Sequence, residues 1–471
     1  MPRHTFLRFL GAVTILGLTT TAAFGQKPPS EPLAASTPAT PVQPVTSAQL
    51  DVSTTSSPHI KALRIDLMAV RGVKKTVMTA GNPGRNSRNN AGPRNIAPLA
   101  LEGSATIATD SKSEPNLPLW TFTVRSSRDG NHYPGVMVGR NPFNDPGPSN
   151  VPTEIVPLII KTQNIGVSFD SNTGVITTTA GATTFNPNRA DDVCLSPPND
   201  VPTRLVSGSP IFTPASFTFG GTFIGKTQYV DAFQRANFWN ALGEDRNSYH
   251  VRLNPVRVLN PIVLNVPSVY GLAITNPLFF GPPAFCAPFG IVDIGWFDNY
   301  VNATLIPSLG SQGVNSSNLP IFLVYNVVWA EPVTNLFSCC ALGYHSITGF
   351  PQLTQTYSPS EFDTTGVFGA PLDSEILSHE VAEWMDDPHT TNPTPLWGNT
   401  GQVQGGCQGN LEVGDPLTGT DVPSVTMPNG FTYHLQELAF FSWFFGAPSI
   451  GVNGWFSDNG TFTTDAGPPC F

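Results

Sequence analysis

One short segment of this 471-residue chain combines side chains that can bind a metal ion. It reads His379-Glu380-Val381-Ala382-Glu383, and an α-helix places residues four positions apart on the same face. His379 and Glu383 would therefore project together and could ligate one cation, while Glu380 would lie beside it. A carboxylate next to a metal site can accept a proton from water bound to the ion. We predict His379 and Glu383 as metal ligands and Glu380 as the general base.

A later acidic segment can supply the third ligand. Glu412 and Asp415 lie close together in the sequence NLEVGD. Catalytic zinc sites keep three protein ligands, and the ligating His is usually oriented by a further carboxylate. We predict Glu412 as the third ligand and Asp415 as the group that orients His379. His389 is the alternative third ligand, because it follows His379 by the ten positions that separate the first and last His of HExxHxxGxxH sites.

The same residues have interpretations that involve no metal. A helix face with His and Glu can be a solvated surface carrying ion pairs, and the acids before Pro416 can form a turn. His345 and His434 are candidate donors to a transition state, although a single His is more often structural. The pair Asp386 and Asp387 could serve a metal-free acid peptidase, but it also fits a turn at the end of a helix.

The elements that would position these residues follow from local patterns. Asp373 can cap a helix over 373–385 that Pro388 ends, with Val381, Trp384 and Met385 in the core. Helices are also predicted over 227–242 and 433–445. Strands are predicted over 119–125, 133–138, 154–168, 256–266 and 320–329. We expect an α+β fold in which a few helices pack on a mixed or antiparallel sheet.

Composition excludes several classes of protein. Glycine (43) and proline (47) make up nearly a fifth of the chain, too much for a helix bundle. The net charge is −10, which argues against nucleic acid or an anionic lipid surface as a partner. No apolar run reaches the roughly 20 residues of a membrane-spanning helix. We therefore expect no nucleic-acid partner and no stable membrane insertion, and the sequence does not indicate an oligomeric state.

The N-terminal region resembles an export signal followed by a spacer. Residues 1–25 carry Arg3 and Arg8, an apolar run and a small-residue cleavage site, and residues 26–60 form a linker rich in Pro, Ser and Thr. We predict a secreted, periplasmic or extracellular protein, with a small β-rich unit over 61–150 and a larger domain over 151–471. Six cysteines without a CxxC motif favour disulfides over a thiolate metal site.

The C-terminal third resembles known families. HExxE followed by an acidic turn is similar to the gluzincin branch of zinc metallopeptidases with the second His replaced by Glu. The region more closely resembles secreted phosphate-induced (EXORDIUM-like) proteins, through five matching pieces: 379–383, Asp387-Pro388, Trp397, 412–415 and 433–436. The resemblance implies a zincin-like domain with a mixed sheet and a metal-binding active-site helix.

The sequence therefore predicts a secreted metal-dependent hydrolase, most simply a zinc peptidase in which Glu380 activates a metal-bound water and the substrate is a peptide or protein. One imidazole and two carboxylates form a harder site than two imidazoles, so another divalent cation can replace zinc. The alternative is a catalytically inactive zincin scaffold that acts as a cell-wall, carbohydrate- or protein-binding module.

Overall fold

The computed structural model describes residues 61–64, 116–162, 166–170, 175–179, 181–190, 194–195, 200–275, 284–330, 340–349, 354–368, 372–399, 406–468 and 470. All of them belong to the unit Asp51–Phe471. The predicted signal (1–25) and linker (26–60) lie outside the described residues.

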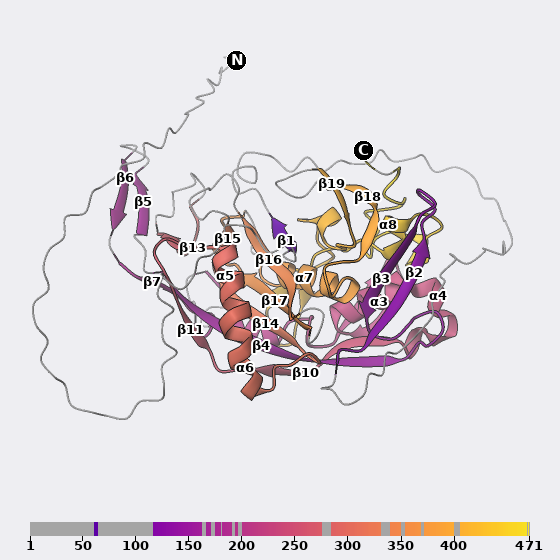
Figure 1. Ribbon diagram of the computed structural model, residues 1–471, viewed down its shortest axis with the longest axis horizontal. Helices are drawn as coiled ribbons and strands as arrows, with labels where there is room; N and C mark the ends of the chain where they lie inside the picture. Colours follow the sequence, from indigo (N-terminus) through magenta and orange to yellow (C-terminus); the bar gives the residue numbers. More distant parts are fainter. Residues whose placement is uncertain are drawn as a thin grey trace, which may run out of the picture. The chain divides into compact units, whose positions relative to one another are not determined.

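A sheet of thirteen strands forms the centre of the fold (Figure 1). Its main path is β10-β4-β14-β17-β16-β15-β13-β12-β5-β6, with β1 beside β16 and with β7 and β11 beside β4. Neighbours of β4 and β14 on this path are parallel, whereas β16 is antiparallel to both β15 and β17. The sheet is thus mixed. Its strands are β1 (Lys61–Arg64), β4 (Pro148–Thr162), β5 (Gly166–Asp170), β6 (Val175–Thr179), β7 (Thr183–Phe185), β10 (His250–Val258), β11 (Ile262–Val266), β12 (Gly271–Ile274), β13 (Phe289–Asp293), β14 (Leu319–Tyr325), β15 (Val327–Ala330), β16 (Ala341–Thr348) and β17 (Gln355–Phe362).

Four strand pairs and several helices surround this sheet. The antiparallel pairs are β2 (Leu119–Arg125) with β3 (His132–Val138), β8 (Ala215–Phe219) with β9 (Thr222–Thr227), β18 (Pro393–Asn399) with β19 (Gly406–Asn410), and β20 (Val425–Thr426) with β21 (Thr432–Tyr433). The α-helices are α2 (Pro202–Ser207), α3 (Tyr229–Asn237), α4 (Trp239–Leu242), α5 (Ile294–Tyr300), α6 (Ile306–Leu309), α7 (Glu375–Asp386) and α8 (Phe441–Phe445). The short turns are η1 (Gly243–Asn247), the π-helical η2 (Val301–Leu305), η3 (Gly310–Gln312), η5 (Asp415–Leu417) and η6 (Val452–Gly454). The expectation of a few helices on a mixed sheet is confirmed.

Helices cover both faces of the sheet. In β14, Ile321 and Leu323 pack in one apolar cluster with residues of α3 and α7, while Phe322 and Val324 pack in a second cluster with residues of α5. A strand buried on both faces is expected to be apolar throughout, as β14 is. Helix α7 contacts β16 and β17, and also β3 and α3. It therefore lies between the sheet and the β2–β3 hairpin (Figure 1).

Strand predictions hold better than helix predictions. The 119–125 and 133–138 strands form the expected hairpin β2–β3. The run 320–329 divides into β14 and β15 at Asn326, whose φ is +56°. The helix predicted over 227–242 begins at Tyr229 and is interrupted at Phe238.

The helix predicted over 433–445 is wrong for most of its length, because α8 spans only its end. The preceding backbone is extended, and its N–H groups donate to distant partners: Gln436 to Ser378 Oγ, Glu437 to the Thr420 carbonyl and Ala439 to the Val413 carbonyl. An aromatic-rich segment buried on every side satisfies its backbone groups equally well in this way. The segment consequently passes beside α7.

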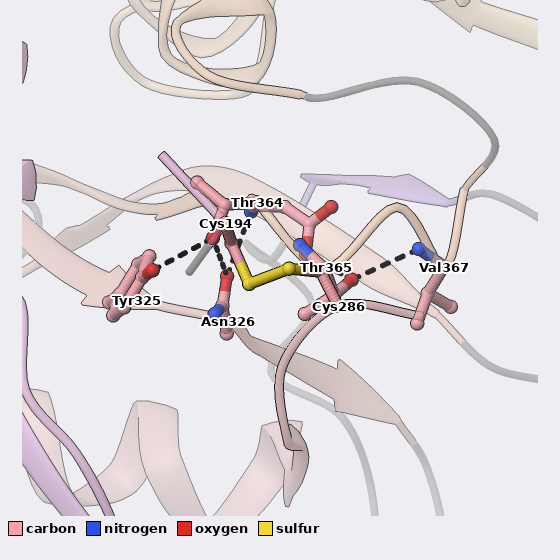
Figure 2. The surroundings of a disulfide bond; sticks show 8 residues. Cys194, Cys286, Tyr325, Asn326, Thr364, Thr365 and Val367 are labelled. Carbon is pink, nitrogen blue, oxygen red and sulfur yellow. Dashed lines mark hydrogen bonds between the residues drawn. A yellow bond between two sulfur atoms is a disulfide. The ribbon is translucent and has the colours of Figure 1, made fainter. Parts of the chain in front are cut away.

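Disulfide-distance cysteine pairs join Cys194 to Cys286 and Cys407 to Cys470, with Cα separations of 5.7 and 5.9 Å. Figure 2 shows the first pair beside Tyr325, Asn326 and the Thr364–Val367 turn. A cavity of about 310 Å³ lies there, lined by both cysteines, Arg189 and Asn326 among others. Such pairs fit an oxidising compartment.

The expected boundary between residues 150 and 151 falls inside β4, a continuous 15-residue strand. The β2–β3 hairpin also shares its core with later segments, because Phe122 packs against Phe441 and Phe445. A separate N-terminal unit over 61–150 is therefore not confirmed. Among the described residues, no helix has the length and apolar character needed to span a membrane.

Candidate metal centre

Helix α7 carries the HExxE segment into the interior of the protein. It spans Glu375–Asp386, and all of its residues are buried. Val381, Trp384 and Met385 pack in the apolar core as predicted, and His379 and Glu383 are only 0% and 2% exposed. The interpretation of this face as a solvated surface is therefore wrong.

One group of potential ligands forms around His379. Its Nε2 lies 3.0 Å from Glu383 Oε1 and 3.7 Å from Asp415 Oδ1. One ligand atom from each of these three residues lies within 4.8 Å of the others, so the group could hold a metal ion. The 3.0 Å approach does not have hydrogen-bond alignment, and Nε2 has no hydrogen-bond partner among the described residues. Atoms that ligate one ion point at that ion rather than at each other, and this arrangement is consistent with such a role.

The orientation of the His379 ring is set by Gln436. The Gln436 side chain donates from Nε2 to the Gly414 carbonyl at 2.6 Å, which turns its Oε1 toward His379 Nδ1, 3.0 Å away. Since Oε1 can only accept, Nδ1 carries the proton and Nε2 faces the two carboxylates. A Cβ atom at position 414 would clash with the His379 ring, so glycine is needed there for this close packing.

Glu383 is held from the opposite side by backbone donors. The N–H groups of Gly414 and Asp415 both donate to its Oε1, at 3.1 and 3.2 Å. Burial alone would raise the pKa of Glu383, but the adjacent His379 and these donors hold it below its ordinary value. Burial alone would lower the pKa of His379, but Glu383 raises it to about 10. The pocket thus favours a positive charge at Nε2, whether a proton or a metal ion supplies it.

A second group forms around His345 on β16. His345 Nδ1 lies 3.4 Å from Glu380 Oε2 and 3.8 Å from Glu383 Oε2, and these three residues also could hold a metal ion. Its Nε2 lies 3.8 Å from Glu412 Oε2. Burial opposes protonation of His345, but Glu380 and Glu383 raise its pKa, whereas burial raises the pKa of Glu380 despite the nearby imidazoles.

The two groups together concentrate negative charge in a buried site. Four carboxyl groups face two imidazoles, so that even doubly protonated histidines would leave a formal charge of −2 if all four carboxyls were ionised. Buried charges are costly unless they are paired or ligate metal ions. The sites could therefore accept divalent cations.

The structure brings most of the predicted residues together but changes several roles. His379 and Glu383 meet as expected, yet Asp415 rather than Glu412 completes their group. Glu412 lies beside His345 instead, and Gln436 rather than Asp415 contacts the Nδ1 atom of His379.

The remaining candidate histidines lie outside these groups. His389 belongs to neither group within the part of the chain that the structure describes. His434 forms an ion pair with Asp373 at 2.7 Å and is partly exposed. Asp387 accepts backbone hydrogen bonds from Thr391 and Asn392, as expected for a turn after a helix.

Two members of the site carry no sequence signal of a ligand or an orienting group. One His on a strand has no ligand spacing, so the sequence offers His345 only as a donor to a transition state. The aromatic pattern around Gln436 predicts a helix there, which hides its proximity to His379.

Comparison with known proteins assigns no family. No family model, no curated protein and no solved structure matches this chain.

Proposed function

We propose that this protein is a metal-dependent hydrolase, most simply a peptidase acting outside the cytoplasm, with a divalent cation held by His379, Glu383 and Asp415. The observation that carries the proposal is the His379 ring. Its Nδ1 proton is committed to Gln436, so its Nε2 faces two carboxylates, and Nε2 has no hydrogen-bond partner among the described residues. Two carboxylates that converge on one imidazole nitrogen favour a positive charge there, which a divalent cation can supply in place of a proton.

The donor set supports a first-row divalent cation. One imidazole nitrogen and two carboxylate oxygens suit zinc, but they also suit manganese or ferrous iron better than a His-rich site would. When bound, such an ion would polarise a substrate carbonyl and acidify water. Ligand deprotonation accompanies binding, so His379 would release its proton as the metal enters.

Glu380 is the residue best placed to move a proton. It follows His379 on α7, and its Oε1 is buried without a hydrogen-bond partner among the described residues. Burial raises its pKa, which brings a carboxylate closer to the neutral range in which general bases work. We assign it the transfer of a proton from the attacking water to the leaving group.

The burial of the ligands favours a second candidate function, a structural cation in a catalytically silent binding protein. His379, Glu383 and Asp415 are at most 4% exposed, whereas a hydrolase must admit a substrate. In that case the ion would stabilise the junction of α7 with the 406–440 region, and any carbohydrate or protein recognition would occur elsewhere.

Metal analysis combined with a hydrolysis assay separates these functions. Purified mature protein should retain stoichiometric metal, and loaded protein should cleave a proteome-derived peptide library, as read by mass spectrometry. Glu380→Gln should abolish cleavage, while the exposed His132→Ala should behave like the unmodified protein. Bound metal without any cleavage would support the structural candidate, and absence of metal after reconstitution would contradict both.

A further inference from the structure

We infer that the site is dinuclear: a second divalent cation is held by His345, Glu380 and Glu383, and Glu383 bridges it to the cation of the His379 group. This inference rests on the proposed metal-dependent function and extends it. It gives Glu380 Oε2 a ligating role, leaves Glu380 Oε1 for the proton transfer assigned above, and makes His345 a metal ligand.

The strongest observation is how Glu383 divides its two oxygens. Oε1 lies 3.0 Å from His379 Nε2, and Oε2 lies 3.8 Å from His345 Nδ1. The carboxylate therefore presents one oxygen to each imidazole, as a carboxylate bridging two ions does. Ions in two-metal hydrolytic sites lie about 3.5–4 Å apart, a separation that the two ends of one carboxylate can span.

The His345 group has the spacing expected of ligands around one ion. Nδ1 lies 3.4 Å from Glu380 Oε2 and 3.8 Å from Glu383 Oε2. Ligands at about 2.1 Å from a tetrahedral ion are separated by about 3.4 Å. Two of the atoms around these positions, His379 Nε2 and Glu380 Oε1, are fully buried without a hydrogen-bond partner among the described residues.

The far side of the His345 ring has a carboxylate near the nitrogen that must carry the proton if Nδ1 ligates an ion. Glu412 Oε2 lies 3.8 Å from Nε2, and its negative charge stabilises a proton on that nitrogen. Nδ1 hydrogen-bonds with Glu380 Oε2 at 3.4 Å, and with a proton held at Nε2 it would offer its lone pair to an ion bound there. A carboxylate behind the ligating imidazole is a common feature of metal sites, and this gives Glu412 a supporting role.

Close packing between α7 and β16 makes this meeting of side chains feasible. Gly343 lies on β16 two residues before His345, and a Cβ at this position would come within 2.7 Å of Glu380 Cγ and 2.8 Å of Ile376 Cγ2. Only glycine lets the helix approach the strand so closely. Each of the two candidate metal sites thus has one glycine whose missing side chain makes room for a ligand residue. Gly343 makes room for Glu380, and Gly414 makes room for His379.

The experiment measures how many ions the full mature chain binds. Chelated protein is reconstituted with Mn²⁺, the free metal is removed, and the content is determined by elemental mass spectrometry together with electron paramagnetic resonance. Unmodified protein should hold two ions per chain with an exchange-coupled spectrum. His345→Ala should hold one ion with an isolated-ion spectrum, and His132→Ala, a substitution on an exposed strand residue, should hold two.

A fold-preserving variant guards against misfolding of His345→Ala. Glu380→Gln retains the side-chain shape, so it should lower the second-site affinity at least tenfold while its circular dichroism stays unchanged. If the unmodified protein and Glu380→Gln both bind one ion per chain, the dinuclear site is overturned but the proposed function stands. No bound ion would overturn both, and two ions in His345→Ala would overturn the assignment of the second position.

Discussion

Replacement of Gln436 by leucine tests whether His379 is held for metal binding. The substitution removes the acceptor for His379 Nδ1 and the donor for the Gly414 carbonyl while keeping a similar volume. Loss of an outer-shell partner typically weakens metal binding by about 10–100-fold, which corresponds to about 1.4–2.7 kcal/mol. Each buried group left without its partner should also cost about 1–3 kcal/mol of metal-free stability.

The matched control is Gln228→Leu, which removes another buried amide with three hydrogen bonds, to Phe212 and Leu253. Both variants should lower the unfolding free energy in denaturant titrations of the metal-free protein. Only Gln436→Leu should lower the affinity for the metal ion, measured by competition with a chromophoric chelator. Gln436→Glu should retain more affinity than Gln436→Leu, because a carboxylate still accepts from Nδ1. Equal affinities for Gln436→Leu and the control would refute the assignment of His379 as a ligand.

The pKa of His379 is raised from 6.5 to about 10, so the stability that its protonation contributes is complete below pH 6.5 and is lost as the pH approaches 10. The thermal unfolding midpoint of the metal-free protein should therefore fall between these pH values. His379→Gln should make the midpoint less dependent on pH over the same interval. Gly414→Ala should bind metal at least tenfold more weakly in chelator competition. It should also lose about 1–3 kcal/mol of unfolding free energy in denaturant titrations, because the added methyl group overpacks the site. Gly398→Ala is the control, since open space surrounds that position, and it should change neither quantity. Joint replacement of Cys194 and Cys286 by Ala should lower the unfolding free energy by about 2–4 kcal/mol, and an unchanged denaturation midpoint would contradict the bridge.

Local patterns predicted the helix that carries the site but not the partners that complete it. The i, i+4 spacing of His379 and Glu383 and the stop at Pro388 are local features, and α7 follows them. Asp373, the expected cap, instead accepts from the backbone N–H of His434 at 2.9 Å, and Ser374 precedes the helix. A side chain that can cap a helix can also fasten a distant segment, and the sequence does not distinguish these uses.

The remaining site residues depend on long-range pairing. His345 reaches Glu380 because β16 lies beside β17 in a sheet whose strand order departs from chain order. Glu412 and Asp415 are only three residues apart, and the path of the chain at Gly414 decides which imidazole each one contacts. Glu412 lies beside His345, and Asp415 lies beside His379. Residue type and approximate region were therefore predictable, whereas the grouping of ligands was decided by tertiary structure.

A hydrogen-bonded network without metal would not need so many carboxylates packed so closely around His379 and His345. A single proton between His379 and Glu383 could satisfy that pair, but the negative charge of Asp415, 3.7 Å from His379 Nε2, would then face an ion pair with no net charge. Close approach at both glycines brings further carboxylates to the same small volume, where like charges repel. Divalent cations would offset that repulsion with two charges each, and one could lie beside each oxygen of Glu383. We therefore propose that the packing at Gly343 and Gly414 supports ion binding, and the number of ions bound per chain tests whether the site holds none, one or two.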